Sequence, residues 1–249
     1  MPRALITGPT AGIGLAFAQA LAAEGHDLVL VSRDKARLEQ LAADLSGRHG
    51  VACEVLPTDL TDAAQTRAVE ELLVDQPVDV LVNNAGFGRK LPFEANDIED
   101  EQASLDVMVR AVLRLSHAAL GSMLTRGHGD IVNVSSVAGF VPRGSYGAHK
   151  AWVISFSRWA NLRYRRQGVR VMALCPGFVR TEFHQRMGVD LSRMPAFLWL
   201  QPEAVVAESL RDLRAGKAVS VPSKRWKVIM AATRVAPAGL VERVARWRR

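Results

Sequence analysis

The sequence is poor in cysteine and has no long uninterrupted apolar run. Its 249 residues include only Cys53 and Cys175, too few for a disulfide framework and typical of a reducing, cytosolic compartment. No apolar run approaches the roughly 20 residues that cross a membrane. Residues 1–3 lead directly into a short apolar run without a signal-peptide pattern. We therefore expect a globular, cytoplasmic protein with a sizeable core.

Most of the chain also lacks an excess of charge. The formal net charge is +7, but residues 223–249 contain eight Lys/Arg and one Glu, so the other residues balance at 24 basic and 24 acidic. This balance, without a supporting motif, predicts no nucleic-acid partner. We divide the chain into one domain over residues 1–222 and a basic extension over 223–249.

The extension is predicted to form an amphipathic helix. Leu240, Val244 and Trp247 would share one face of it, among arginines. Three interpretations stay open. The helix docks on an anionic membrane surface, binds a CoA-like phosphate, or packs on the domain with its arginines in water.

Short apolar segments alternate with longer amphipathic ones along the domain. The short segments are rich in Val, Ile and Leu, as strands covered on both faces are. We expect strands over residues 3–7, 27–32, 51–56, 78–83, 130–135, 169–175 and, last, 217–222. Helices are expected over 12–25, 34–47, 62–75, 99–127, 147–168 and 202–216. This alternation predicts an α/β fold, with a doubly wound, mostly parallel seven-stranded sheet covered by helices on both faces.

A glycine-rich loop follows the first predicted strand. Gly8, Gly12 and Gly14 lie in "TGPTAGIG", residues 7–14, directly before a predicted helix. Such a loop turns tightly, lets the backbone approach a pyrophosphate and directs helix N–H groups at it. Because strand, loop and helix come in this order, we predict nucleotide binding rather than a plain turn.

The end of the second predicted strand bears on the choice of cofactor. An acidic residue there would bind a ribose 2′-hydroxyl and repel a 2′-phosphate, but this chain has Ser32 and Arg33. Arg33 could pair with a 2′-phosphate, whereas Asp34 is better interpreted as a helix cap. NADP(H) is therefore the preferred cofactor, and NAD(H) is the alternative.

A tyrosine and a lysine lie one turn apart in a predicted helix. Tyr146 and Lys150 are separated by four residues in "SYGAHKAW", so both side chains would rise from one face. The pair is either a surface coincidence or an acid/base device. A nearby lysine cation and an oxidised, positively charged nicotinamide ring would both favour the phenolate of a tyrosine whose ordinary pKa is too high for a base at neutral pH.

Six short motifs together resemble the short-chain dehydrogenase/reductase family over residues 3–222. They are "TGPTAGIG" (7–14), "TDL" (58–60), "NNAG" (83–86), "NVSS" (133–136), "YGAHK" (146–150) and "PGFVRT" (176–181). The resemblance implies a Rossmann-type fold, hydride transfer between a nicotinamide and a carbonyl, and a homodimer or homotetramer. It implies that Ser136, Tyr146 and Lys150 are catalytic and that no metal takes part.

The resemblance also implies a set of residues that bind the cofactor. Together with the arguments above, the set is Gly8, Thr10, Gly12, Ile13, Gly14, Ser32, Arg33, Asp59, Leu60, Asn84, Ala85, Gly86, Tyr146, Lys150, Pro176, Gly177, Val179 and Thr181.

Two departures from the family pattern bear on catalysis. The interval between Ser136 and Tyr146 is about three residues shorter than in many relatives, so Ser135 is an alternative to Ser136. In "LDVMVRAVLRL" (105–115), Met108 occupies the place of an asparagine that holds a relay water in the family. A thioether cannot take over the hydrogen bonds of an amide.

The sequence limits the substrate less closely than the reaction. Residues 182–200 show no clean period and are interpreted as a flap over a pocket. Its apolar residues predict a hydrophobic ketone or alcohol, as for hydroxysteroid dehydrogenases and 3-oxoacyl reductases, which the chain resembles most. The predicted lining is Val137, Phe183, Met187, Met194, Phe197, Leu198 and Trp199. The competing hypotheses are a nucleotide-sensing binding protein on the same fold and a membrane-surface scaffold.

Overall fold

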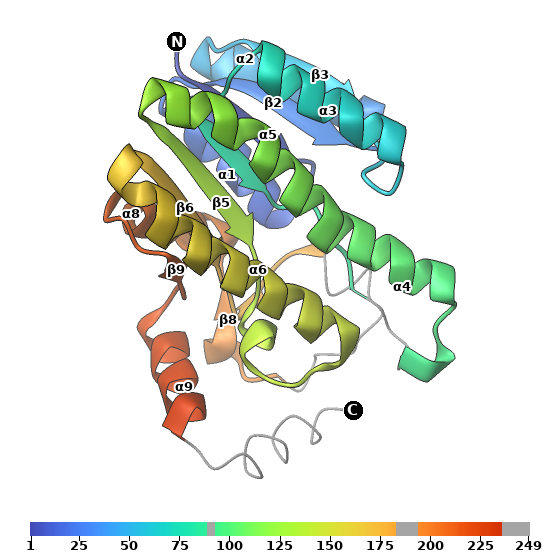
Figure 1. The fold of residues 1–249 in the computed structure, drawn as a ribbon, viewed down its shortest axis with the longest axis vertical. Helices are drawn as coiled ribbons and strands as arrows, with labels where there is room; N and C mark the ends of the chain where they lie inside the picture. Colours follow the sequence, from blue (N-terminus) through green and yellow to red (C-terminus); the bar gives the residue numbers. More distant parts are fainter. Residues whose placement is uncertain (89–92, 183–193, 236–249) are drawn as a thin grey trace.

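A seven-stranded parallel sheet runs through the molecule, as the sequence pattern predicts (Figure 1). The structure is a computed structural model that describes residues 1–88, 93–182 and 194–235. The strand order is β3-β2-β1-β4-β5-β6-β9. The strands are β1 Arg3–Thr7, β2 Asp27–Ser32, β3 Cys53–Pro57, β4 Val80–Asn83, β5 Gly129–Val134, β6 Val169–Leu174 and β9 Val219–Ser220.

The observed strands differ from the predicted ones at their ends. β3 and β4 each begin two residues later than predicted, and β9 has two residues where six were expected. β9 is short because it pairs only with Ala173 and Leu174, at the end of β6. Apolar sequence beyond the paired residues continues as loop.

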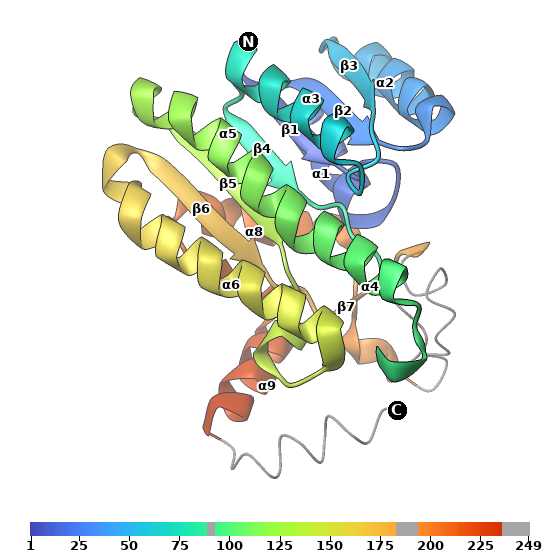
Figure 2. The ribbon, with the colours of Figure 1, turned by 45° about the vertical axis from the view of Figure 1, so that its right-hand side comes forward.

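Helices cover both faces of the sheet (Figures 1 and 2). Alternate strand residues point to opposite faces, so Ile6 packs in a cluster with Phe17 and Leu38, and Leu5 packs in another with Leu73 and Leu115. The first face carries α1 Gly12–Ala23, α2 Lys35–His49 and α8 Pro202–Arg214. The second carries α3 Ala63–Asp75, α5 Ala111–Arg126 and α6 Gly144–Tyr164.

The predicted helix over residues 99–127 is interrupted. The structure has α4 Ile98–Leu105, a π-helical turn over Asp106–Arg110 and then α5. In this turn the Ala111 N–H bonds to the Asp106 carbonyl, five residues back. Such turns insert one extra residue and are frequent at functional sites. The turn contains Met108, which is 1% exposed.

The same segment has a strongly apolar composition. Ile98–Arg126 is long enough to cross a membrane, and an 18-residue window within it, with a mean hydropathy of 1.3, is apolar enough by composition. The expectation that no segment approaches this length is therefore wrong, because a few charged residues do not lower the average enough. Leu115 and Met123 of this helix are fully buried among strand residues, so packing on the sheet accounts for the apolar composition.

The predicted flap and extension are described only in part. β7 Phe178–Val179 pairs with β8 Trp199–Leu200 in a small parallel ribbon, while residues 183–193, including Phe183 and Met187, lie outside the described residues. Helix α9 Lys224–Val235 follows β9 and packs on the domain through Trp226 and Met230. The remaining residues of the predicted extension, 236–249, lie outside the described part, as do Leu240, Val244 and Trp247.

The strand order creates a crevice at one end of the sheet. β1 pairs with β2 on one side and with β4 on the other, so the chain connections leave β1 and β4 in opposite directions. In open parallel sheets, ligands bind beyond the carboxyl ends of the strands at such a reversal. The loops after β1, β4 and β5 all end there.

Candidate active site

The glycine loop after β1 adopts a conformation that only glycine takes easily. Gly8 and Gly12 have φ angles of 66° and 57°, in the left-handed region that other residues avoid. A Cβ on Gly14 would lie 2.1 Å from the Gly8 carbonyl oxygen, so this position admits no side chain. Ala11 precedes α1 and offers no capping side chain. The first N–H groups of α1 are therefore available to an anion.

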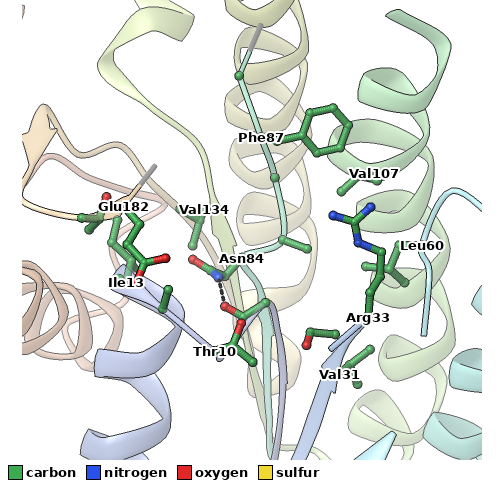
Figure 3. Close-up of a pocket in the computed structure, with 18 of the residues that line it drawn as sticks. Thr10, Ile13, Val31, Arg33, Leu60, Asn84, Phe87, Val107, Val134 and Glu182 are labelled. Carbon is green, nitrogen blue, oxygen red and sulfur yellow. Dashed lines mark hydrogen bonds between the residues drawn. The ribbon is translucent and has the colours of Figure 1, made fainter. Parts of the chain in front are cut away.

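The turn after β4 is tied to this loop by hydrogen bonds. Asn84 Nδ2 donates to the carbonyl oxygens of Thr7 at 2.9 Å and of Gly8 at 3.0 Å. Thr7 Oγ1 accepts in return from the backbone N–H groups of Asn84 and Ala85. Figure 3 shows Asn84 between Thr10 and Val134 in the wall of the cavity. These bonds hold two of the predicted motifs in one arrangement.

A cavity of about 850 Å³ opens over these loops. Every predicted cofactor-binding and catalytic residue lines it except Gly14, which supports the loop from below. The roles of these residues stay predictions, but the structure brings them together. Ser135, the alternative to Ser136, and Asp34, the predicted helix cap, line the cavity as well. It is also lined by residues that were not singled out from the sequence, namely Ala11, Val31, Arg37, Thr58, Thr61, Phe87, Gly88, Val107, Val134 and Glu182.

Two arginines lie at the β2 side of the cavity. Arg33 is 74% exposed at its side chain and lies 4.0 Å from Asp59. Arg37 lies in the first turn of α2 and pairs with Asp34 and Glu182 at 3.4 and 3.8 Å. The Asp34 carboxylate accepts the Arg37 N–H at 3.1 Å, so the interpretation of Asp34 as a helix cap is confirmed. Sequence reasoning missed Arg37, although its place four residues after Arg33 at a helix start was a usable signal.

The donor set of the cavity fits a nicotinamide dinucleotide. The Ser32 hydroxyl is buried in the cavity wall and has no hydrogen-bond partner among the described residues. An unpaired buried hydroxyl is costly unless a ligand satisfies it. Together with the glycine loop, the free helix N-terminus and the two arginines, it provides places for a ribose, a pyrophosphate and a further phosphate.

Tyr146 and Lys150 face the cavity from the first two turns of α6. The Tyr146 hydroxyl shares a side-chain hydrogen bond with Ser136. Lys150 Nζ donates to the Val134 carbonyl oxygen at 2.8 Å, which places the lysine against the end of β5. The Ser135 hydroxyl donates instead to the Lys150 backbone carbonyl at 2.8 Å. Of the two serines, Ser136 is therefore the one that contacts the tyrosine.

Burial governs the ionisation of this pair. Desolvation raises the pKa of Tyr146 to about 12, against the opposing influence of the Ser136 hydrogen bond and of Arg143. Desolvation also lowers the pKa of Lys150 to about 8. The expected lowering of the tyrosine pKa by Lys150 is therefore wrong for the protein without its cofactor. Both groups are more neutral than in water.

Met108 fills the space behind Lys150. A Cβ on Gly86 would lie 3.5 Å from the Met108 sulfur and 3.8 Å from Lys150 Nζ. The thioether therefore packs where the "NNAG" turn and the lysine meet. Because Met108 is fully buried and has no hydrogen-bond donor, this wall of the lysine pocket is apolar.

None of the described residues that were expected to line the substrate site lines the cavity. Val137, Met194 and Leu198 belong to one apolar cluster with Trp226 and Met230. By contrast, Phe197 is exposed and lies under the Arg225 guanidinium. The Trp199 ring contacts Phe178 and Arg180.

Comparison of the sequence with known protein families shows the family to which the chain belongs. The family described as "short chain dehydrogenase" matches residues 2–191. The chain belongs to this family. Among curated proteins, the very-long-chain 3-oxoacyl-CoA reductase of Anas platyrhynchos is 33% identical over 187 residues. That match covers 72% of this chain but only 60% of the length of the duck protein.

Two solved structures resemble this chain over nearly its whole length. A short-chain dehydrogenase from Sphingobium yanoikuyae in complex with NADPH is 36% identical, with a TM-score of 0.86, and the match covers 97% of this chain and 95% of that one. The bulky-bulky ketone specific alcohol dehydrogenase from Comamonas testosteroni is 31% identical, with a TM-score of 0.82, covering 97% and 94%. Both are oxidoreductases by name and share the fold described here.

Proposed function

We propose that this chain is an NADP(H)-dependent oxidoreductase that reduces a bulky, hydrophobic ketone to a secondary alcohol. The observation that carries the proposal is the meeting of Tyr146, Lys150 and Ser136 in the wall of a cavity that the glycine loop also lines. The solved relative with NADPH and the bulky-ketone dehydrogenase support the cofactor and the substrate class by analogy.

The residues at the β2 side favour the phosphorylated cofactor. Gly8, Gly12 and the start of α1 would hold the pyrophosphate, and Arg33 and Arg37 would pair with the 2′-phosphate. Both arginines are paired with carboxylates in this structure, so binding would exchange these partners for the phosphate. Asp59 accepts hydrogen bonds from Thr61, which fixes one of its oxygens.

Residues in the other half of the cavity would carry out the proton transfer to the substrate. A reduced nicotinamide supplies a hydride to the carbonyl carbon when it is bound. Ser136 would donate a hydrogen bond that orients the substrate oxygen, and Tyr146 would give that oxygen its proton. The raised pKa of Tyr146 keeps the phenol protonated at neutral pH, which is the form that a general acid needs. Lys150 would hold the ribose beside it.

An apolar cluster next to Ser136 supports a hydrophobic substrate. Val137 and Phe140 follow Ser136 and pack with Leu198 in this cluster. None of the three lines the cavity itself, so a substrate that reaches beyond the cavity would meet an apolar wall there. A ligand that meets such a wall gains affinity from its apolar area and is oriented by a few polar groups. We therefore expect aromatic, steroid-like or 3-oxoacyl ketones to be preferred over short, polar ones.

A homodimer or homotetramer stays part of the proposal. Trp159 and Leu162 of α6 are exposed, and Trp159 continues a row of ring contacts with Phe156 and Trp152. Contiguous exposed apolar side chains often mark an interface. Light scattering on the purified chain would give its mass, and a monomer would contradict this part.

The function is tested by following NADPH oxidation with bulky ketones, steroid ketones and 3-oxoacyl thioesters. We expect turnover with at least one class. Tyr146→Phe should lower kcat by about 100-fold or more while NADPH binding stays nearly intact. Tyr164→Phe changes the other tyrosine of the chain and should retain turnover. Full turnover by Tyr146→Phe would show that the proton comes from another group.

A further inference from the structure

Helix α9 lies beyond the 2–191 match to the family, yet it reaches a loop of the cavity. In Figures 1 and 2 it lies at the end of the sheet toward which the strands point. Its Trp226 side chain is only 6% exposed. The indole N–H donates to the Leu198 carbonyl oxygen at 3.1 Å, and the ring centre lies 5.7 Å from that of Phe178.

The indole of Trp226 occupies the space beside Gly177. A Cβ on Gly177 would lie 2.0 Å from Cε2 of the indole, and its three nearest atoms would all belong to Trp226. Gly177 is not among the glycines with a positive φ. Its backbone conformation would therefore accept a side chain, and it is the tryptophan that excludes one.

Gly177 connects Trp226 to the reacting end of the cavity. Pro176, Gly177 and Val179 line the cavity together with Tyr146 and Lys150. The Pro176 carbonyl oxygen accepts the Val137 N–H at 3.1 Å, and Val137 directly follows Ser136. Displacement of the Gly177 backbone would therefore be transmitted to the serine side of the site as well.

Helix α9 is held firmly enough to position this loop. Glu208 of α8 accepts hydrogen bonds from Ser223 N at 2.9 Å and from Lys227 Nζ at 2.6 Å. Burial alone would raise the pKa of Glu208, but these two donors outweigh it and the pKa is lowered. The charged carboxylate thus joins α8 to the first turn of α9. Trp226 lies between these two contacts in the sequence.

We propose that Trp226 is a positioning residue that holds the Pro176–Val179 segment against the nicotinamide half of the bound cofactor. This inference rests on the proposed function. Trp226 is not among the residues that line the cavity, whereas Gly177 is, so the tryptophan would act through Gly177. Its effect should therefore fall on the nicotinamide end of the ligand and spare the adenosine end, where Arg33 and Arg37 lie.

The first test compares two ligands by calorimetry, NADPH and 2′-phospho-ADP-ribose, which lacks the nicotinamide. Trp226→Ala should weaken NADPH binding by about tenfold, the loss expected when one or two hydrogen bonds to the nicotinamide half are no longer made, and leave the fragment nearly unchanged. Met230→Ala is the matched control. It removes a similarly buried side chain from the same helix and cluster, and none of the three atoms nearest to a Cβ on Gly177 belongs to it. It should lower the Tm and spare both ligands.

Two outcomes of this comparison would overturn the inference. Equal weakening of NADPH and the fragment by Trp226→Ala would show a general loss of structure. The same selective loss in Met230→Ala would show that helix docking matters and the indole does not. Both readouts are equilibrium binding. Failure of every ketone to turn over would therefore contradict the proposed function and leave this result unaffected.

A double-mutant cycle tests the contact itself. Gly177→Ala places a methyl group into the indole and should weaken NADPH binding more than Trp226→Ala does. In the Trp226→Ala background the space is free, so adding Gly177→Ala should change the NADPH Kd by less than about twofold. Independent sites give additive effects within about 0.5 kcal/mol. Additive losses would therefore contradict a direct contact between these residues.

Discussion

The Lys150 ammonium lies 5.7 Å from the centre of the Tyr146 ring, one helical turn away. Within the described residues, no carboxylate forms an ion pair with this lysine, and its Nζ bonds a neutral carbonyl oxygen. Lys150 is only 5% exposed. A buried cation without a counter-charge is costly, so the Tyr146–Lys150 pair is held in place at the expense of stability.

This arrangement predicts a pH dependence of stability. Lys150 titrates near 8 in the folded protein and near 10.5 when unfolded, so between these pH values the unfolded chain binds more protons. The free energy of unfolding should then rise with pH over this window, by on the order of 3 kcal/mol in total. Tyr146 acts in the opposite direction above pH 10, because its folded pKa is the higher one.

Urea titrations of the wild type and Lys150→Met from pH 7 to 10 check this prediction. The wild type should gain stability relative to the variant as pH rises through 8, since the variant lacks the titrating group. A constant difference between the two proteins over this range would mean that Lys150 is not desolvated.

Arg33 is predicted to set the preference for NADPH over NADH. Arg33→Asp removes a partner of the 2′-phosphate and adds a repelling charge, so NADPH binding should weaken roughly ten- to a hundredfold and the preference should reverse. Fluorescence titration with both cofactors measures this. Lys35→Ala is the control, because Lys35 lies two residues away, pairs with Glu39 and does not line the cavity. Equal affinities of the wild type for NADPH and NADH would contradict the prediction.

Met108 is predicted to limit the supply of protons to Lys150. Met108→Asn introduces an amide that can hold a water beside the lysine, so kcat should rise. Burying an amide in this apolar wall should lower the free energy of unfolding by about 1–3 kcal/mol. Met108→Leu keeps the volume and the apolar wall, so its kcat should match the wild type. Equal kcat for Met108→Asn and the wild type would show that protons reach Lys150 by another path.

The basic extension can be tested only by removing residues beyond α9. A chain ending at Ser223 would lose Trp226 and Met230, which are buried in the domain, and its failure would be uninformative. A chain ending at Val235 keeps them. If residues 236–249 bind an anionic surface, flotation with anionic liposomes should fall sharply for this truncation and be salt-sensitive in the full chain. Equal flotation would exclude this role, and neutral liposomes are the control.

Many residues of the site lie close to one another in the sequence, and their types and spacing are enough to predict them. Gly8, Gly12 and Gly14 are placed by the needs of one turn, and Tyr146 and Lys150 by one turn of helix. The order of apolar and amphipathic segments is sufficient for the sheet and its covering helices. Asp34 is identified as a cap by its position alone.

What the sequence misses depends on contacts between distant segments. The π-helical turn at Asp106–Arg110 is invisible to a helical period, because one extra residue changes the pattern too little. The pKa of Tyr146 cannot be inferred from Lys150 alone, because the desolvation comes from every element around it. Arg37 becomes part of the site only when α2 is placed against the cavity.

The sequence by itself determined the family, because six short motifs occur in order along the chain. It also predicted the glycine loop and the Tyr146–Lys150 pair, because each depends on residues that are close in the chain. Only the tertiary structure decided that Ser136 and not Ser135 contacts the tyrosine, that Met108 lies against Gly86, and that Trp226 excludes a side chain at Gly177. These relationships depend on how close-packed elements fill space, and such packing has no period along the chain.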